Sequence, residues 1–106
     1  MDINLDDVTV TNNTAAQQYE ARIGGHVAFL EYAREGNRLV LIHTEVPKPL
    51  EGRGIAGKIV KAALDDARAQ HLEVIPQCPY VASYIKRHQD YLDLVPPDRR
   101  QSVQRA

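Results

Sequence analysis

Cysteine is nearly absent from this chain of 106 residues, which contains only Cys78. A single cysteine allows neither an internal disulfide nor a metal site built from four cysteines. A chain without disulfides is typical of a reducing compartment, so we expect a cytoplasmic location. The four histidines, His26, His43, His71 and His88, show no metal-ligand spacing, and we predict no metal site.

Excess charge of one sign and long apolar runs are absent as well. Thirteen Lys and Arg residues against fourteen Asp and Glu residues give a formal net charge of −1, which argues against broad nucleic-acid binding. No apolar run approaches the ~20 residues that cross a bilayer. The start of the chain is acidic and does not resemble a signal peptide. We therefore expect neither a nucleic acid nor a membrane as a partner.

The sequence does contain enough apolar material for one compact core. Hydrophobic residues make up 43% of the chain, well outside the range of disordered proteins. The length is normal for one domain and too short for two. We predict one folded domain over residues 1–95, followed by a flexible polar tail over residues 96–106.

The hydrophobic pattern predicts three antiparallel strands, a helix, a further strand and a second helix. Gly24-Gly25 is a hairpin signal, and residues 11–14 have the composition of a turn. This order predicts an α+β fold in which two main helices pack on a mixed sheet of about four or five strands, antiparallel at its start. The predicted strands are residues 17–23, 26–33, 38–46 and 72–75, and the predicted helices are residues 55–70 and 80–89.

Three glycines, Gly52, Gly54 and Gly57, lie between the third strand and the first helix. Glycine permits a close ligand approach, and the free amides at a helix N-terminus suit phosphate. A glycine-rich turn without a ligand is the structural alternative. Residues 52–58 also match the start of a nucleotide P-loop, but Ile59 stands where Ser or Thr would hold magnesium. The antiparallel strands before the loop argue further against a nucleotide triphosphatase.

The segment Glu51-Gly52-Arg53-Gly54-Ile55-Ala56 resembles the Gln/Arg-x-x-Gly-x-Gly/Ala signature of the GNAT N-acetyltransferase superfamily. Gly54 and Ala56 meet its last two positions, and Glu51 replaces the usual Gln or Arg. With residues 43–47, 75–81 and 84–91, the loop is similar to the minimal yjdJ-type GNAT domains over about residues 17–95. The resemblance implies that acetyl-CoA is the cosubstrate and that the reaction is N-acetyl transfer to an amine, whose identity the sequence leaves open.

The resemblance also implies cosubstrate contacts. The strand edge at Val46 would pair with the pantetheine amides, and the loop amides would hold the pyrophosphate of coenzyme A. Arg53 and Lys58 could add positive charge there, with a solvated surface cation as the alternative. His88 and Tyr91 fall near the last helix, where the family often keeps coenzyme contacts. The loop positions are Arg53, Gly54, Ile55, Ala56, Gly57 and Lys58.

Cys78 is the first candidate for a reactive role. It follows a predicted strand and precedes a helix that begins at Pro79, where the helix dipole would favour the thiolate. The thiol could accept the acetyl group transiently, or it could protonate the thiolate that leaves. A small buried apolar residue is the alternative reading of a lone cysteine.

Three further residues are candidates for acid–base chemistry. By simple alternation, His43 and Glu45 lie on one face of their strand, together with Leu39 and Leu41, and they could serve as a general base. A structural histidine at the end of a sheet is the alternative. Tyr84 is a candidate proton donor, and packing against the sheet is the alternative for Tyr80, Tyr84 and Tyr91.

An acetyl-CoA-dependent N-acetyltransferase is therefore the predicted function. A non-catalytic acyl-CoA-binding or protein-interaction module is the alternative. The chain is short, and no evident segment between the first strands would form an acceptor pocket. This favours either the non-catalytic alternative or an enzyme whose acceptor is large and contributes its own surface.

Overall fold

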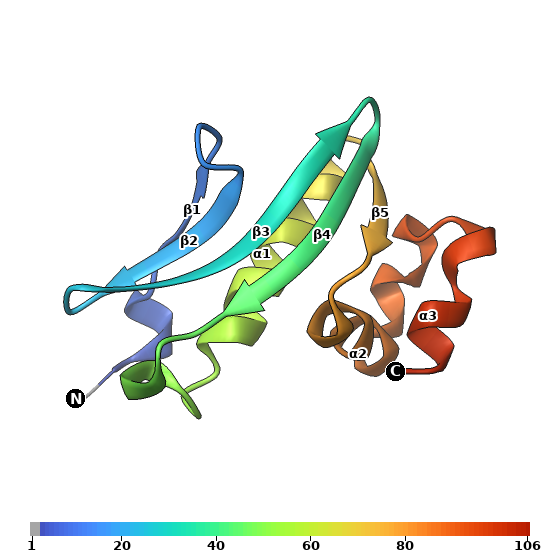
Figure 1. Ribbon diagram of the computed structural model, residues 1–106. Coiled ribbons are helices and arrows are strands. Elements are labelled where there is room, and N and C mark those ends of the chain that lie inside the picture. Colours follow the sequence, from blue (N-terminus) through green and yellow to red (C-terminus); the bar gives the residue numbers. More distant parts are fainter. Residues whose placement is uncertain (1–2) are drawn as a thin grey trace.

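The computed structural model describes residues 3–106 and contains a five-stranded mixed sheet (Figure 1). The first four strands are antiparallel neighbours in chain order, and the fifth lies parallel to the fourth. The predicted α+β class is thus confirmed. The strands, in their spatial order, are β1 (Val10–Asn13), β2 (Gln18–Ile23), β3 (His26–Glu35), β4 (Arg38–Glu45) and β5 (Glu73–Pro76).

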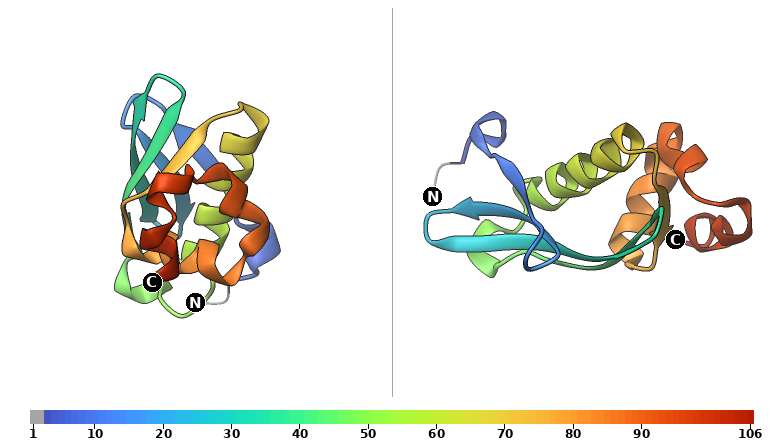
Figure 2. Two further views of the ribbon diagram at one scale, coloured as in Figure 1. Left: turned by 90° about the vertical axis from the view of Figure 1, so that its right-hand side faces the viewer. Right: turned by 90° about the horizontal axis from the view of Figure 1, so that it is seen from above.

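Two main helices, α1 (Ile55–Ala69) and α2 (Pro79–Arg87), pack together on one face of the sheet. Figure 2 shows α1 lying along this face, while the opposite face of β2 and β3 stays open. We call that opposite face the outer face. The remaining helical segments are η1 (Leu5–Asp7), η2 (Lys48–Leu50), η3 (Gln89–Leu94), η4 (Pro97–Arg99) and α3 (Gln101–Gln104).

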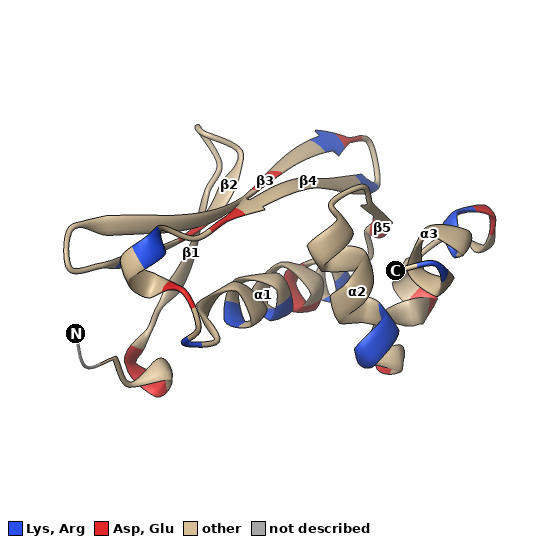
Figure 3. Ribbon diagram, turned by 60° about the horizontal axis from the view of Figure 1, so that its bottom comes forward, with Lys and Arg blue, Asp and Glu red and all other residues tan. Residues whose placement is uncertain are grey.

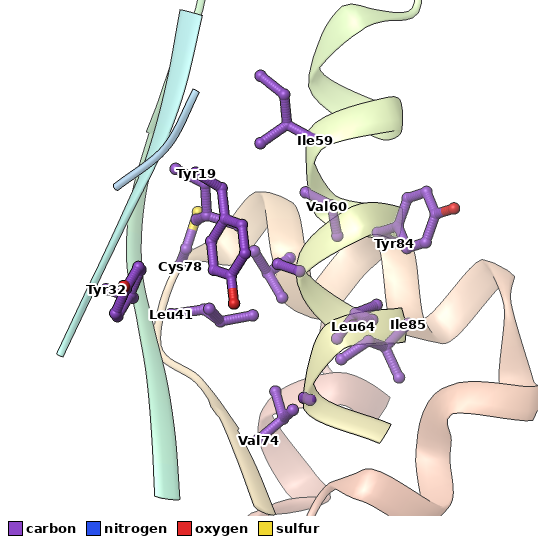
Figure 4. Packing of buried hydrophobic residues seen from close by; sticks show 14 of the residues in the cluster. Tyr19, Tyr32, Leu41, Ile59, Val60, Leu64, Val74, Cys78, Tyr84 and Ile85 are labelled. Carbon is purple, nitrogen blue, oxygen red and sulfur yellow. The ribbon is translucent and has the colours of Figure 1, made fainter. Parts of the chain in front are cut away.

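The core lies between α1, α2 and the inner face of the sheet (Figure 4). Apolar residues recur along α1 at helical spacing, and burying each Leu or Ile side chain contributes about 1.5–3 kcal/mol. The Tyr19 hydroxyl of β2 also donates a hydrogen bond of 2.6 Å to Asp66 of α1, which joins the two layers. The buried residues of α1 are Ile55, Ile59, Val60, Ala63, Leu64 and Ala67.

A β-bulge in β4 interrupts the regular alternation of its side chains. Tyr32 of β3 pairs with Leu41, whereas the preceding residue, Glu31, pairs with His43. Ile42 is therefore the extra residue of the bulge, with no partner of its own in this ladder.

The bulge reverses the face of every β4 residue that follows it. Thr44 pairs with the buried Leu30 and lies on the inner face, as Leu41 does before the bulge. His43 and Glu45 consequently point to the outer face, where both are exposed. The prediction that they share a face with each other is confirmed, but the prediction that this face is that of Leu39 and Leu41 is wrong.

Residues 11–13, predicted to be part of a turn, instead belong to β1, and the turn occupies residues 14–17. Asparagine disfavours strands because its side chain competes for backbone hydrogen bonds. Here both asparagines also bond to side chains of the neighbouring strands, although the Asn13 amide oxygen accepts a backbone hydrogen bond of 3.2 Å from Ala16. Asn12 accepts a hydrogen bond of 2.7 Å from the Tyr32 hydroxyl, and Asn13 donates one of 3.1 Å to Glu20.

Residues 96–106, predicted to be a flexible tail, instead form η4 and α3 and fold back against α2. Val103 is buried in the main core, with 1% of its surface exposed. The Lys86 ammonium of α2 donates hydrogen bonds to the carbonyls of Gln104 and Ala106, at 3.1 and 2.9 Å. Val103 and Lys86 therefore hold this segment against the domain, although its polar composition is typical of a flexible tail.

Across residues 3–106, the helices are too short or too polar to span a bilayer.

Candidate functional site

β4 and β5 separate after a short parallel ladder, and we call the place where they part the fork. Leu41 and Pro76 form the last ladder pair. The Cys78 amide then donates a hydrogen bond of 2.8 Å to the Leu41 carbonyl, and the Thr44 hydroxyl lies 3.4 Å from the Cys78 thiol. Beyond this point β4 continues to Glu45 alongside β3, while β5 has turned into α2 (Figure 1). One edge of β4 is thereby available to an extended ligand.

The glycine loop connects η2 to α1 beside the fork. Gly52 and Gly54 have φ values of +76° and +80°, a region that side chains with a Cβ rarely adopt. Gly54 is the N-cap of α1, and the buried Ile55 side chain anchors the first turn in the core. The amides of residues 55–57 precede the first intrahelical hydrogen bond, which Lys58 donates to Gly54. These amides and the helix dipole form a cradle suited to a phosphate group.

A cavity of about 270 Å³ joins the end of β4, the glycine loop and the first turn of α2. Four of the predicted coenzyme-contact residues line it: Val46, Gly54, Ile55 and Ala56. A larger cavity of about 440 Å³ lies between η1 and the first two strands, and none of the predicted site residues lines it. A further cavity of about 270 Å³ is lined by one predicted residue, Lys58. The cavity at the glycine loop therefore gathers more of the predicted coenzyme-contact residues than either of the other two.

Tyr80 also lines this cavity, although its sequence context predicts only packing against the sheet. It is 38% exposed. A Cβ placed on Gly57 would lie 3.7 Å from its hydroxyl oxygen, so the phenol reaches the first turn of α1. The only sequence signal was its place directly after Pro79, in the first turn of α2.

The two predicted phosphate-binding cations differ in their surroundings. Arg53 is exposed on the glycine loop. The Lys58 ammonium instead donates a hydrogen bond to the Leu5 carbonyl of η1, and a Cβ placed on Gly54 would lie 3.2 Å from the Leu5 side chain. The N-terminal segment thus packs over the first turns of α1 and holds Lys58.

Cys78 and the His43–Glu45 pair lie on opposite faces of the sheet at the fork. Cys78 is the N-cap of α2, is 4% exposed and packs in the main core. His43 Nε2 lies 3.7 Å from Glu45 Oε2, and the two side chains are 58% and 62% exposed. The structure thus places the Cys78 thiol and the His43–Glu45 pair at the same end of β4, on opposite sides of the bulged strand.

Tyr84, His88 and Tyr91 form a separate cluster over α1 and α2. The Tyr84 and His88 rings stack with their centroids 4.1 Å apart, and the Tyr91 hydroxyl donates a hydrogen bond of 2.7 Å to Asp65. Burial raises the pKa of the Tyr84 phenol. In Figure 4 the Tyr84 hydroxyl points away from the sheet and from Cys78. A Cβ placed on Gly57 would nevertheless lie 3.7 Å from the Tyr84 ring, so this ring borders the first turn of α1 while its hydroxyl points away from the fork.

Within the described part of the chain, no group of three or more His, Cys, Asp or Glu side chains could hold a metal ion.

Comparison with known proteins assigns the chain to a family. The family of GCN5-related N-acetyl-transferases matches residues 18–94. The chain belongs to this GNAT family. The match begins at the start of β2 and ends with η3, so it contains the fork, the glycine loop and α2 but neither η1 nor α3.

Several vertebrate proteins are similar to this GNAT chain over most of its length. Protein NATD1 of Mus musculus is 36% identical over 95 residues, which cover 85% of this chain and 86% of the mouse protein. Protein NATD1 of Homo sapiens is also 36% identical over 95 residues, covering 85% and 84%. Protein NATD1 of Danio rerio is 32% identical over 102 residues, covering 88% and 93%.

Proposed function

We propose that this chain is an acetyl-CoA-dependent N-acetyltransferase. The observation that carries the proposal is the fork between β4 and β5, which opens beside the glycine loop in a chain of the GNAT family. At the fork, the open edge of β4 lies next to the N-terminus of α1. The open edge can form hydrogen bonds with the amides of pantetheine, and the helix N-terminus can bind the pyrophosphate.

Binding of acetyl-CoA would use backbone groups more than side chains. The free edge of β4 from Ile42 to Val46 would pair with the pantetheine amides, and the amides of residues 55–57 would receive the pyrophosphate. Arg53, exposed on the loop, would supply positive charge more readily than Lys58, because Lys58 is already bonded to Leu5.

The chemistry requires a neutral amine and a proton for the departing sulfur. The amine nitrogen forms a bond to the thioester carbonyl carbon, the carbon–sulfur bond breaks, and the thiolate takes up a proton. In this proposal the exposed His43–Glu45 pair would accept the proton that the amine loses. Cys78 at the fork, or Tyr80 in the cavity, would donate the proton to sulfur. In a two-step route the Cys78 thiolate would carry the acetyl group first.

A non-catalytic acyl-CoA-binding or protein-interaction module is the second candidate. The observation that favours it is the connection between β1 and β2, which is only the turn of residues 14–17. A connection this short leaves no segment to enclose a small acceptor beside the fork.

The first test is calorimetric titration of the purified chain with acetyl-CoA, with MgATP as the control ligand. Saturable binding of acetyl-CoA alone, at micromolar concentration, supports the assignment of the glycine loop. Release of the coenzyme thiol on addition of amine acceptors then separates the enzyme from the binding module. If acetyl-CoA does not bind, the proposed function is wrong.

A further inference from the structure

We infer that the outer face beside the fork binds a basic, lysine-bearing polypeptide segment, and that this segment is the acetyl acceptor. The inference rests on the proposed function, whose acceptor is otherwise unspecified. The surface concerned consists of five side chains from β2, β3 and β4, which we call the outer-face patch: Glu20, Phe29, Glu31, His43 and Glu45.

The pairing of the strands makes this patch continuous. Phe29 of β3 lies opposite Glu20 on one side and opposite Glu45 on the other, and Glu31 lies opposite His43. The Phe29 and His43 rings meet edge to face, with their centroids 6.4 Å apart. Paired side chains of neighbouring strands lie roughly 5 Å apart, so one aromatic ring is surrounded by carboxylates on three sides.

The patch carries more negative charge than its neighbours neutralise. Arg22 forms an ion pair of 3.1 Å with Glu20, which is buried. Glu31 and Glu45 are both exposed. Among residues 3–106, His43 is the basic group that contacts Glu45, at 3.7 Å. A cationic partner would complement the charge of this surface.

The positive side chains of the two main helices lie on the other layer of the molecule. Figure 3 shows Lys and Arg segments on α1 and α2, with an acidic segment between those of α1, and acidic segments on the strands near the fork. Lys61 of α1 forms an ion pair with Asp65. Glu31 and Glu45 of the outer-face patch are exposed, and this local negative charge suits a cationic acceptor.

The shape of the patch favours a polypeptide over a small free amine. The connection between β1 and β2 is only the turn of residues 14–17, and in Figure 2 no other element covers the outer face of β2 and β3, whereas small ligands need an enclosing cleft. A polypeptide can cover several strands at once and place its own surface over the fork. The half-buried Phe29 ring offers an apolar seat for lysine methylenes and a π face for an ammonium group.

The position of the patch also connects the acceptor to the reaction. His43 and Glu45 belong to the patch and lie on the outer face at the fork, while the coenzyme cavity is lined by the glycine loop and the first turns of α1 and α2. A lysine held over Phe29 would approach the fork from the side opposite the coenzyme. Its ammonium proton would pass to the His43–Glu45 pair, and its nitrogen would then be free to attack.

The test is binding of a fluorescent peptide of alternating Lys and Gly to the full chain without coenzyme, measured by anisotropy. The comparison peptide has Gln in place of each Lys. The double variant Glu31→Gln/Glu45→Gln should weaken binding of the lysine peptide about tenfold, the combined effect of two exposed ion pairs. Glu35→Gln is the matched control, because Glu35 is an exposed glutamate at the far end of the same strand. Raising the salt concentration should weaken binding as well.

Amide chemical shifts of the unsubstituted chain give a second readout that needs no variant. The lysine peptide should move the resonances of residues 29–31 and 43–45 and leave those of α2 in place. Equal binding of both peptides, an equal loss in the Glu35→Gln control, or shifts confined to the helices would overturn the inference. Spermidine binding at the patch without peptide binding would overturn the polypeptide assignment. Acetyl-CoA titration of the same samples tests the proposed function separately, since peptide binding is measured without coenzyme.

Discussion

The Thr44 hydroxyl lies 3.4 Å from the Cys78 thiol, at the point where β4 and β5 part. This contact depends on the bulge at Ile42, because without it His43 and not Thr44 would face inward. The bulge therefore places a hydroxyl against the only cysteine of the chain and turns a histidine and a carboxylate to the other face. Each of these groups can be tested separately.

Cys78→Ala should lower the rate of acetyl transfer about a hundredfold if the thiol donates the proton to the departing sulfur or carries the acetyl group. Loss of a small buried side chain should cost only about 1 kcal/mol of folding stability, so acetyl-CoA should still bind. Thiol-release rates and an acetyl-CoA titration measure the two effects. Thr44→Val, which replaces the hydroxyl with a methyl group, is the companion variant. A Cys78→Ala protein with the full rate would show that the cysteine only packs in the core.

Gly54→Ala should weaken acetyl-CoA binding about tenfold or more and destabilise the fold. The positive φ of +80° strains any residue with a Cβ by about 1–2 kcal/mol. The new methyl group would also lie 3.2 Å from the Leu5 side chain and displace the loop amides. Urea unfolding and calorimetric titration give the two quantities.

Gly36→Ala is the matched control for this variant. Gly36 has a φ of +62°, and a Cβ there would meet no atom within 4 Å. The control should lose stability through backbone strain and keep its affinity for acetyl-CoA. Equal affinity losses in the two variants would mean that the glycine loop has no special role in binding.

Local patterns in the sequence predicted most of the fold. Alternation located β2, β3 and β4, and helical spacing located α1, whose first residue is Ile55 as predicted. Gly54 makes that boundary visible, since its left-handed conformation precedes the first turn. β1 and α3 were missed because distant residues stabilise them. Tyr32 and Glu20 bond to the asparagines of β1, and Lys86 bonds to the C-terminus.

The candidate site was predicted less completely than the fold. The residues that form the phosphate cradle are contiguous in sequence, so the glycine motif alone was enough to predict the cradle. The outer-face position of His43 and Glu45 depends on one extra residue, Ile42, in the register with β3, which no periodicity reveals. Tyr80 reaches the cavity only because α2 packs beside the first turn of α1. Sequence patterns do not predict how two helices pack against each other.

Tyr80→Phe should lower the rate of acetyl transfer, whereas Tyr84→Phe should leave it nearly unchanged. Tyr80 lines the cavity at the fork, but the Tyr84 hydroxyl points away from the sheet (Figure 4). Each substitution removes one phenol oxygen, and the two positions lie one helical turn apart, so each variant is the control for the other. If the Tyr80 phenol donates the proton, its loss should cost about a hundredfold in rate. A larger effect of Tyr84→Phe would show that the coenzyme approaches α2 from its other side.

Folding stability should fall steeply below about pH 4, because contacts in the folded state lower the pKa of two carboxylates and so favour their ionised forms. The hydrogen bonds from Arg68 hold the pKa of Asp93 below its ordinary value of 3.8. Burial opposes ionisation of Asp65, but hydrogen bonds from Lys61 and Tyr91 still lower its pKa. A carboxylate whose pKa is lower in the folded state stabilises the fold above its unfolded pKa, and that contribution disappears as the pH falls through the folded pKa.

Thermal unfolding of Asp93→Asn between pH 3 and pH 6 tests the acid sensitivity. The variant should have a lower Tm at pH 6 and a smaller fall in Tm on acidification, because it no longer takes up a proton when it unfolds. Asp98→Asn is the control, since Asp98 is 72% exposed and lies 3.7 Å from its neighbour Arg99. The bidentate contact between Arg68 and Asp93, at 2.9 Å for both hydrogen bonds, ties η3 to α1. An unchanged acid profile in Asp93→Asn would mean that this contact forms without stabilising the fold.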